Sequence, residues 1–203
     1  MNGALAGGIV LAGGKSTRMG APKATLAFGP ETMLQRVVRL LTTVVSPIVV
    51  VGASGQELPE LPPAVIVTRD EHQARGPLEA LRAGLTSLPS PADAAYVTSC
   101  DVPLLVPAFV ARMIDLLGDH DIAVMEIDGF THPLSAVYRR TTLPRIEALL
   151  TADRLRPAFL FDAVRTRRVK PEEMTSADPQ LYTLRNLNTQ EDYLAALAEA
   201  GFG

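Results

Sequence analysis

The segment from Gly8 to Lys23 reads GIVLAGGKSTRMGAPK and decides the fold. Its first four residues, Gly8–Leu11, predict a buried strand, and the glycine-rich stretch that follows predicts a loop at the carboxyl end of that strand. Open α/β sheets bind ligands at this edge, where successive backbone N–H groups form a concavity for anions. Arg18 and Lys23 add positive charges suited to a triphosphate. The segment therefore predicts a polyphosphate site; the alternative is a plain glycine-rich turn with surface charges.

This loop differs from two familiar phosphate-binding patterns. It matches neither G-x-x-x-x-G-K-[ST] nor G-x-G-x-x-G. The second expected strand ends at Val51-Gly52, without the acidic residue of a dinucleotide-binding oxidoreductase. An oxidoreductase is therefore disfavoured.

The rest of the chain alternates β-rich runs with helical periodicity, which is typical of an α/β protein with a mostly parallel sheet. Strands are expected at 8–11, 48–51, 65–68, 95–99, 122–127, 134–138 and 167–170. Helices are expected at 31–45, 77–88, 107–117, 142–150, 155–164 and 189–200. An Asp128-Gly129 turn predicts a hairpin between the fifth and sixth strands. We predict one domain over residues 1–203, a Rossmann-like three-layer sandwich with a mixed, mostly parallel sheet.

Composition narrows the class of protein. Of the 203 residues, 47% are apolar and 20% are charged, as in ordinary globular chains. No apolar run is long enough for a membrane span, and no signal-peptide pattern begins the chain. The single cysteine, Cys100, fits a reducing compartment, so we expect a cytoplasmic protein. A net charge of −3 argues against a nucleic-acid binder. The basic stretch Arg165–Lys170 is expected to be a solvated strand edge, the alternative being a docking patch for an anion.

Asp101 directly follows the expected strand 95–99 and Cys100, and it is the candidate metal ligand. Magnesium binds proteins through one or two carboxylates plus substrate phosphates, and the glycine-rich loop is expected nearby. The alternative is that Asp101 caps a turn before Pro103. The three histidines lack metal-ligand spacing, which argues against a zinc site. Cys100 is expected to be a small core residue and not a nucleophile.

Five segments resemble the signature elements of the small-molecule nucleotidyltransferases, and in particular those of the molybdenum cofactor guanylyltransferases. The resemblance begins with the loop Leu11–Lys23. It continues, in order, with Asp70 and Gly76-Pro77-Leu78, with Ser99–Pro103, with His132-Pro133-Leu134 and with Asn186–Thr189. These segments span almost the whole chain, and their joint occurrence is far more specific than any one of them.

The resemblance implies a nucleotidyltransferase that transfers GMP from GTP to the terminal phosphate of molybdopterin, releasing pyrophosphate, with Mg²⁺ as cofactor. It implies a nucleotide-binding half, 1–105, and an acceptor-binding half, 106–203. GTP and molybdopterin are the implied substrates, and molybdenum-insertion proteins and molybdoenzyme chaperones are the implied protein partners. No nucleic acid or membrane is implied.

The same resemblance assigns roles to individual residues. Magnesium is implied at Asp101, and the implied catalytic residues are Asp101, Lys23 and Arg18. The implied nucleotide contacts are Leu11, Ala12, Gly13, Gly14, Ser16, Lys23, Asp70, Gly76, Pro77 and Asp101. The implied acceptor contacts are His132, Asn186 and Asn188, with Arg154 and Arg156 as further phosphate contacts. If their segment is extended, Asn186 and Asn188 face the same side; alternatively the segment forms a turn, and Asn188 or Thr189 caps the last helix.

Some assignments leave alternatives open. Related cytidylyltransferases carry L-A-A-G where this chain has Leu11–Gly14, so Gly13 favours guanine over cytosine. A CTP-dependent relative and a catalytically silent module that delivers cofactor are the alternative functions. Asp70 has the alternative of an ordinary charged loop. Two departures from the family pattern are Glu79-Ala80 in place of Ala-Gly, and Gln190 in place of a proline.

Overall fold

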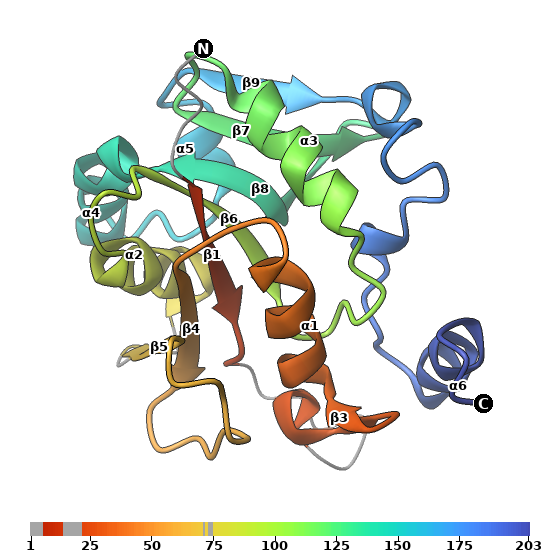
Figure 1. Ribbon diagram of the computed structural model, residues 1–203. Helices are drawn as coiled ribbons and strands as arrows, with labels where there is room; N and C mark the ends of the chain where they lie inside the picture. The colour runs from red at the N-terminus through yellow and green to blue at the C-terminus, as the bar shows by residue number, and fades with distance from the viewer. Residues whose placement is uncertain (1–5, 14–21, 71, 73–74) are drawn as a thin grey trace.

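The computed structural model describes residues 6–13, 22–70, 72 and 75–203. Within these residues, seven strands form one sheet in the order β5-β4-β1-β6-β8-β7-β9 (Figure 1). Neighbouring strands are parallel, except that β8 runs antiparallel to both β6 and β7. The strands are β1 (Ala6–Leu11), β4 (Ile48–Ala53), β5 (Ile66–Asp70), β6 (Ala94–Ser99), β7 (Ile122–Ile127), β8 (Phe130–Arg139) and β9 (Thr166–Val169). The mixed, mostly parallel sheet predicted from the sequence is therefore confirmed.

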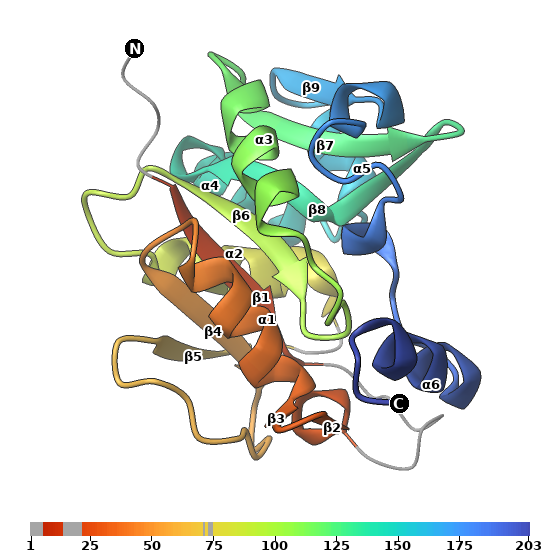
Figure 2. The ribbon, with the colours of Figure 1, turned by 45° about the vertical axis from the view of Figure 1, so that its right-hand side comes forward.

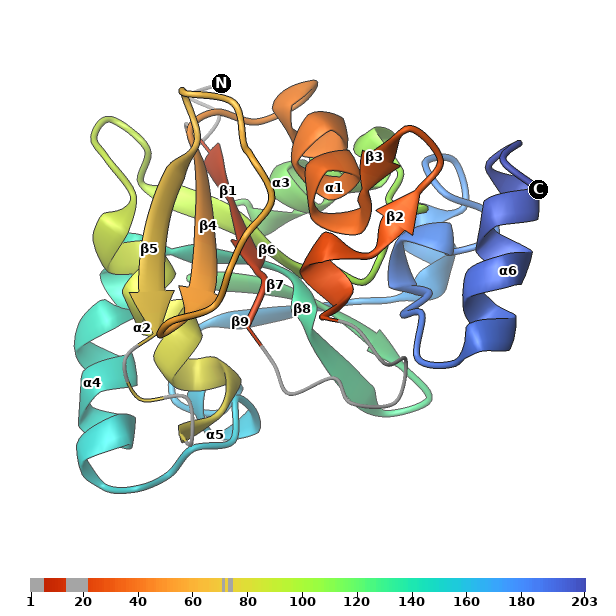
Figure 3. The same ribbon diagram turned by 90° about the horizontal axis from the view of Figure 1, so that it is seen from below.

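Helices cover both faces of the sheet, because successive side chains of a strand point to opposite faces. In β1, Val10 packs in the cluster that includes α1 and α3, whereas Ile9 and Leu11 pack with α2, α4 and α5. Figure 3 shows these two layers on either side of the strands. The helices are α1 (Met33–Thr42), α2 (Pro77–Ser87), α3 (Pro107–Leu117), α4 (Leu143–Thr151) and α5 (Ala158–Phe161). Each helix in the described ranges is too short or too polar to cross a bilayer. The predicted three-layer sandwich is confirmed.

The helix expected from Glu31 begins at Met33 instead. The hydroxyl of Thr32 accepts the Gln35 N–H at 3.2 Å, and the Gln35 amide oxygen accepts the Thr32 N–H at 2.8 Å. Such a capping box satisfies N–H groups that have no partner within the helix. Glu31–Thr32 forms the short strand β3, which pairs with β2 (Ala27–Phe28).

The C-terminal helix α6 (Gln190–Glu199) packs against this small hairpin, away from the main sheet. Phe28 and Met33 are fully buried in a cluster with Leu187 and Ala196. Figure 2 shows α6 on the side of the molecule where β2 and β3 lie. The sequence predicts the helix itself, but its hydrophobic periodicity does not say which element it packs against.

The hairpin expected between 122 and 138 is confirmed, but its second strand starts at Phe130 and not at 134. Asp128 and Gly129 form the turn with φ values of 50° and 80°, a region that these residue types tolerate. The pairing of β7 with β8 shifts register between Val124 and Met125, opposite the stretch that contains Pro133. Proline has no N–H for the ladder and is confined to such irregularities. It also interrupts the strand pattern, which is why the sequence predicts the strand only after it.

The helix expected over 155–164 is wrong in extent, because α5 covers only Ala158–Phe161. Residues that precede a proline avoid the helical conformation, and Pro157 therefore keeps Leu155 and Arg156 outside the helix. The described 3₁₀ helices are η1 (Lys23–Thr25), η3 (Arg140–Thr142), η4 (Pro171–Met174) and η5 (Tyr182–Leu184).

The basic stretch at β9 lies on an edge of the sheet, and carboxylates neutralise it. The ion pairs are Arg165–Asp119, Arg167–Glu173, Arg168–Glu126 and Lys170–Glu126. This pairing supports the interpretation as a solvated strand edge over a docking patch for an anion.

A buried carboxylate organises the chain between β9 and α6. Asp178 is 2% exposed and accepts hydrogen bonds from Tyr182 N at 3.0 Å, Thr183 N at 2.9 Å and Thr183 Oγ1 at 2.7 Å. The Thr183 hydroxyl in turn accepts the Val106 N–H at 3.0 Å. These bonds tie the segment 178–183 to Val106, in the chain that follows β6. Asn186 lies just after this segment.

Replacing Asp178 by alanine should lower the free energy of unfolding by about 2–4 kcal/mol, because a buried donor left without its acceptor costs about 1–3 kcal/mol. Chemical denaturation measures the change. The exposed Asp115 of α3 is the matched control, and Asp115→Ala should stay within about 0.5 kcal/mol of the parent. Equal effects of the two substitutions would show that Asp178 does not hold the segment.

Candidate active site

The candidate site lies where β1 and β6 end side by side. Leu11 is opposite Ser99 in their parallel ladder, and the Cys100 N–H donates to Leu11 O at 3.2 Å. On the other side of β1 lies β4, the strand that follows α1, so the order of strands reverses between β1 and β6. Such a switch point leaves a crevice at the carboxyl ends of the strands, where ligands bind. The chain after Leu11 and the residue Asp101 therefore both lie at this crevice.

Asp101 has both carboxylate oxygens engaged at this point. Oδ2 accepts from Lys23 Nζ at 2.7 Å, and the two side chains are only 15% and 14% exposed. Oδ1 accepts from Asn186 Nδ2 at 2.8 Å and from the Ser99 hydroxyl. Within the described part of the chain these donors are all side chains, so Asp101 does not serve as a turn cap there. Its carboxylate instead has an orientation fixed from three sides.

Lys23 also reaches the C-terminal segment. Its Nζ donates to Asn188 Oδ1 at 3.0 Å, in addition to its contact with Asp101. Thr189 is the N-cap of α6 and forms a capping box with Asp192, which confirms a capping role for this segment. The amides of Asn186 and Asn188 thus face the same ion pair, as expected if they lie on one side of the segment.

The chain that leaves β1 lies close to the end of β4. The Ala12 N–H donates to Val51 O at 2.9 Å. A Cβ on Gly13 would lie 3.3 Å from Ala53 N, so glycine allows the chain after β1 to approach the end of β4 this closely. Leu11, Ala12 and Gly13 are thus placed at the switch point, as predicted. Three further residues predicted for this loop lie outside the described residues: Gly14, Ser16 and Arg18.

Asp70 and Gly76-Pro77 mark the end of β5 and the start of α2. Gly76 has a φ of 74°, which would strain a residue with a side chain, and Pro77 occupies the first helical turn. Asp70 is 8% exposed, and its carboxylate accepts the His72 N–H at 2.9 Å. That bond is what an ordinary charged turn would make, and a nucleotide contact by Asp70 stays a prediction.

The departure from the family pattern at Glu79 places a buried carboxylate in the first turn of α2. Its side chain is 5% exposed and contacts Arg82 at 2.7 Å, His72 at 3.7 Å and Arg75 at 4.0 Å. Arg75 also pairs with Asp153 at 3.6 Å. These contacts bring the loop after α4 beside the start of α2.

That loop carries Arg154 and Arg156, which sequence reasoning assigns to phosphate. The Arg154 guanidinium stacks on the ring of Phe159 at 4.0 Å from its centroid. Within the described residues, neither arginine forms a hydrogen bond or an ion pair with Asp101. Their phosphate role stays a prediction.

His132 and Cys100 lie on the neighbouring strand β8 and directly after β6, respectively. Ser135 of β8 pairs with Thr98 near the end of β6, and His132 precedes it, so it lies toward the same edge as Asp101. Burial lowers the pKa of His132, which keeps its imidazole neutral near pH 7. Cys100 is 5% exposed, and burial raises the pKa of its thiol to about 12. Its expected place as a core residue is confirmed.

Sequence reasoning assigns no role to three residues that shape the site: Ser99, Asp178 and Gln56. Ser99 precedes Asp101 by two positions at a strand end, so strand alternation is a signal that could have found it. Asp178 and Gln56 lie in loops without any periodic pattern. Their contacts become visible only in three dimensions.

Comparisons with known proteins identify the family of the chain. The family model of the MobA-like NTP transferase domain matches residues 8–168. A probable molybdenum cofactor guanylyltransferase of Mycobacterium avium (strain 104) is 38% identical over 95% of each chain.

Solved structures share the fold. The molybdopterin-guanine dinucleotide biosynthesis protein A of Archaeoglobus fulgidus has a TM-score of 0.77 at 18% identity, over 95% of this chain and 97% of that one. A Mycobacterium tuberculosis H37Rv protein in complex with manganese has a TM-score of 0.60 at 18% identity, over 94% and 97%. The chain therefore belongs to the MobA-like NTP transferase family and is a nucleotidyltransferase.

Proposed function

We propose that the chain is a molybdenum cofactor guanylyltransferase, which transfers GMP from GTP to the terminal phosphate of molybdopterin. The Lys23–Asp101 ion pair at the switch point carries the proposal, because it places a cation for phosphates beside a carboxylate for a metal ion. The Mycobacterium avium relative supports the choice of nucleotide and acceptor.

The transfer exchanges one phosphorus–oxygen bond for another. An oxygen of the acceptor's phosphate bonds to the α-phosphorus of GTP, and the bond from that phosphorus to the leaving pyrophosphate breaks. A phosphate monoester has a second pKa of about 6 in phosphoamino acids, so such an acceptor is already anionic at neutral pH. The site then needs no strong general base, and its main task is to offset the repulsion between two polyanions. The ammonium of Lys23 is suited to this task.

A divalent metal ion fits the donors at Asp101. Carboxylate oxygens are ligands that Mg²⁺ prefers, and the related structure with manganese supports a divalent ion in this fold. Within the described residues, Asp101 does not join two further His, Cys, Asp or Glu side chains in a metal-binding group. We therefore propose that Mg²⁺ takes its other ligands from the triphosphate and water. Bound there, it would neutralise charge on the phosphates and on the leaving pyrophosphate.

Lys23 competes with that metal ion for Asp101 until a nucleotide arrives. Its ammonium contacts Oδ2, while Asn186 and Ser99 hold Oδ1. A triphosphate offers Lys23 another anionic partner and thereby frees Oδ2. The metal ion should accordingly bind more tightly together with the nucleotide than alone.

The acceptor is proposed to approach from the half 106–203. His132 is neutral near pH 7, so its imidazole can hydrogen-bond a polar group without adding charge. Asn186 and Asn188 contact Asp101 and Lys23 directly. These two amides are thus proposed to form the boundary between the nucleotide-binding half, 1–105, and the acceptor.

A panel of nucleoside triphosphates with Mg²⁺ and molybdopterin tests the proposed reaction by release of pyrophosphate. We expect GTP to be the preferred substrate, because Gly13 matches the guanine-specific pattern. A preference for CTP would show that the enzyme is a cytidylyltransferase and not a guanylyltransferase. No pyrophosphate with any triphosphate would overturn the enzymatic role on molybdopterin in favour of a delivery module.

Lys23→Met should raise the KM for GTP about 10- to 100-fold, since a hydrogen bond to a charged group contributes about 1.5–3 kcal/mol. The same substitution should strengthen binding of Mn²⁺ without nucleotide, because Asp101 loses its competing cation. Steady-state kinetics and electron paramagnetic resonance of free Mn²⁺ measure the two effects. Lys170, paired with Glu126 at the far edge of the sheet, provides the control Lys170→Met. An unchanged KM for GTP would show that Lys23 does not contact the triphosphate.

A further inference from the structure

Gln56 joins the last residue of β4 to the first residue after the neighbouring strand β1. Its Oε1 accepts the Ala53 N–H at 2.8 Å, and its Nε2 donates to Ala12 O at 2.9 Å. The backbone ladder between these strands pairs residues as far as Leu11 and Val51. The side-chain amide of Gln56 therefore continues the connection beyond the last paired residues, just before Gly13.

Gly13 depends on this connection for its position. It packs against Ala53, and a Cβ there would lie 3.3 Å from Ala53 N and 3.5 Å from Ala53 Cβ. Both backbone groups of Ala12 are used by the protein, its N–H by Val51 O and its C=O by Gln56. Within the described part of the chain, Gly13 makes no such hydrogen bond. Gly13 is thus the first residue after β1 whose backbone N–H and C=O can hydrogen-bond a ligand.

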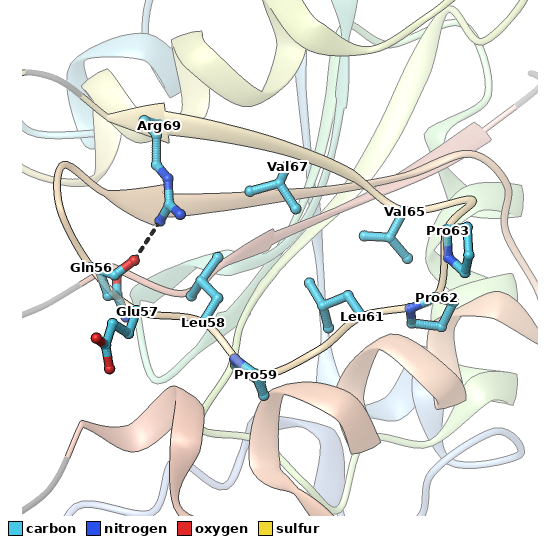
Figure 4. Close-up of a pocket in the computed structure, with 10 residues that line it drawn as sticks. All are labelled: Gln56, Glu57, Leu58, Pro59, Leu61, Pro62, Pro63, Val65, Val67 and Arg69. Carbon is cyan, nitrogen blue, oxygen red and sulfur yellow. Dashed lines mark hydrogen bonds between the residues drawn. The ribbon is translucent and has the colours of Figure 1, made fainter.

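Gln56 is itself fixed from the edge strand β5. Arg69 Nη1 donates to Gln56 O at 3.0 Å and to Ala53 O at 3.3 Å. Gly52 leaves room for this guanidinium, because a Cβ on Gly52 would lie 2.3 Å from Nη1. Figure 4 shows Arg69 and Gln56 together at one end of a hollow of about 480 Å³ between β5 and the proline-rich segment 56–65. Arg69 therefore holds the backbone of Gln56, while the side-chain amide of Gln56 bonds to Ala53 and Ala12.

We propose that Gln56 is a positioning residue for the nucleotide. By holding Ala12 and the end of β4 at Ala53 together, it sets the backbone surface at Gly13 on which the base of the triphosphate is bound. This role rests on the proposed function, because it assumes that a nucleoside triphosphate occupies the switch point. Losing the amide should weaken nucleotide binding without affecting the acceptor or the chemical step.

Two substitutions separate the amide from the space that it fills. Gln56→Ala removes both, whereas Gln56→Met keeps an unbranched side chain of similar length but removes the hydrogen bonds. Each should raise the Kd and the KM for GTP about fivefold or more, since a hydrogen bond contributes about 1 kcal/mol net. The kcat and the KM for molybdopterin should stay at the wild-type values. Calorimetric titration with GTP and Mg²⁺ gives the Kd independently of turnover.

Gln35→Ala is the matched control. Gln35 Nε2 donates to Glu60 O, so it supports the same proline-rich segment 56–65, but from α1 and not through Ala12 or Ala53. This variant should lose stability and keep its affinity for GTP. The positioning role is overturned if Gln56→Met has the wild-type Kd for GTP, or if Gln35→Ala raises that Kd as much as Gln56→Met does. A wild-type protein that binds no GTP at all would overturn the proposed function, and this role with it.

Discussion

The ion pair between Lys23 and Asp101 is the interaction on which the candidate site depends. It joins the start of η1 to the second residue after β6, with 2.7 Å between Nζ and Oδ2 and little exposure of either side chain. A pair sheltered in this way is less screened by salt than a surface pair. Asn186 and Asn188 each bond to one member of the pair. Three separate stretches of the chain therefore meet at one carboxylate and one ammonium: the start of η1, the Ser99–Asp101 stretch and the Asn186–Asn188 stretch.

The C-terminal segment completes this arrangement, although it is remote in sequence from the glycine-rich loop. The Leu187 N–H donates to the backbone oxygen of Asp101 at 3.0 Å, which places the flanking asparagines on the pair. Asp178 holds the segment on one side, and α6 packs on Phe28 on the other. Because α6 packs beside the hairpin that follows Lys23, one cluster supports both partners of the Lys23–Asn188 contact. Substitutions that disrupt the packing of that cluster should therefore disturb the Lys23–Asn188 contact as well as lower the stability of the fold.

Much of the fold follows from local patterns. The buried strand that ends at Leu11, the helix α2 with Pro77 in its first turn and the hairpin at Asp128-Gly129 each have a clear sequence signal, and the structure has all three. The extent of α5 and the start of β8 were harder to predict, since Pro157 and Pro133 interrupt the patterns that mark those elements. For the site, strand ends identify Asp101, and motif resemblance identifies Lys23, Asn186 and Asn188. Gln56 and Asp178 have no such signal, because they lie in loops without periodicity and bond mainly to backbone groups, which residues of every type carry.

The most direct measurement is the affinity for Mn²⁺ in the presence of a non-hydrolysable GTP analogue, read from the electron paramagnetic resonance of the free ion. If Asp101 at the switch point holds the metal with the triphosphate, Asp101→Asn should raise the Kd for Mn²⁺ by more than about tenfold while circular dichroism shows an intact fold. An Asp101→Asn protein that is folded, binds the analogue and retains the wild-type Kd for Mn²⁺ would contradict the role of Asp101 as the metal ligand.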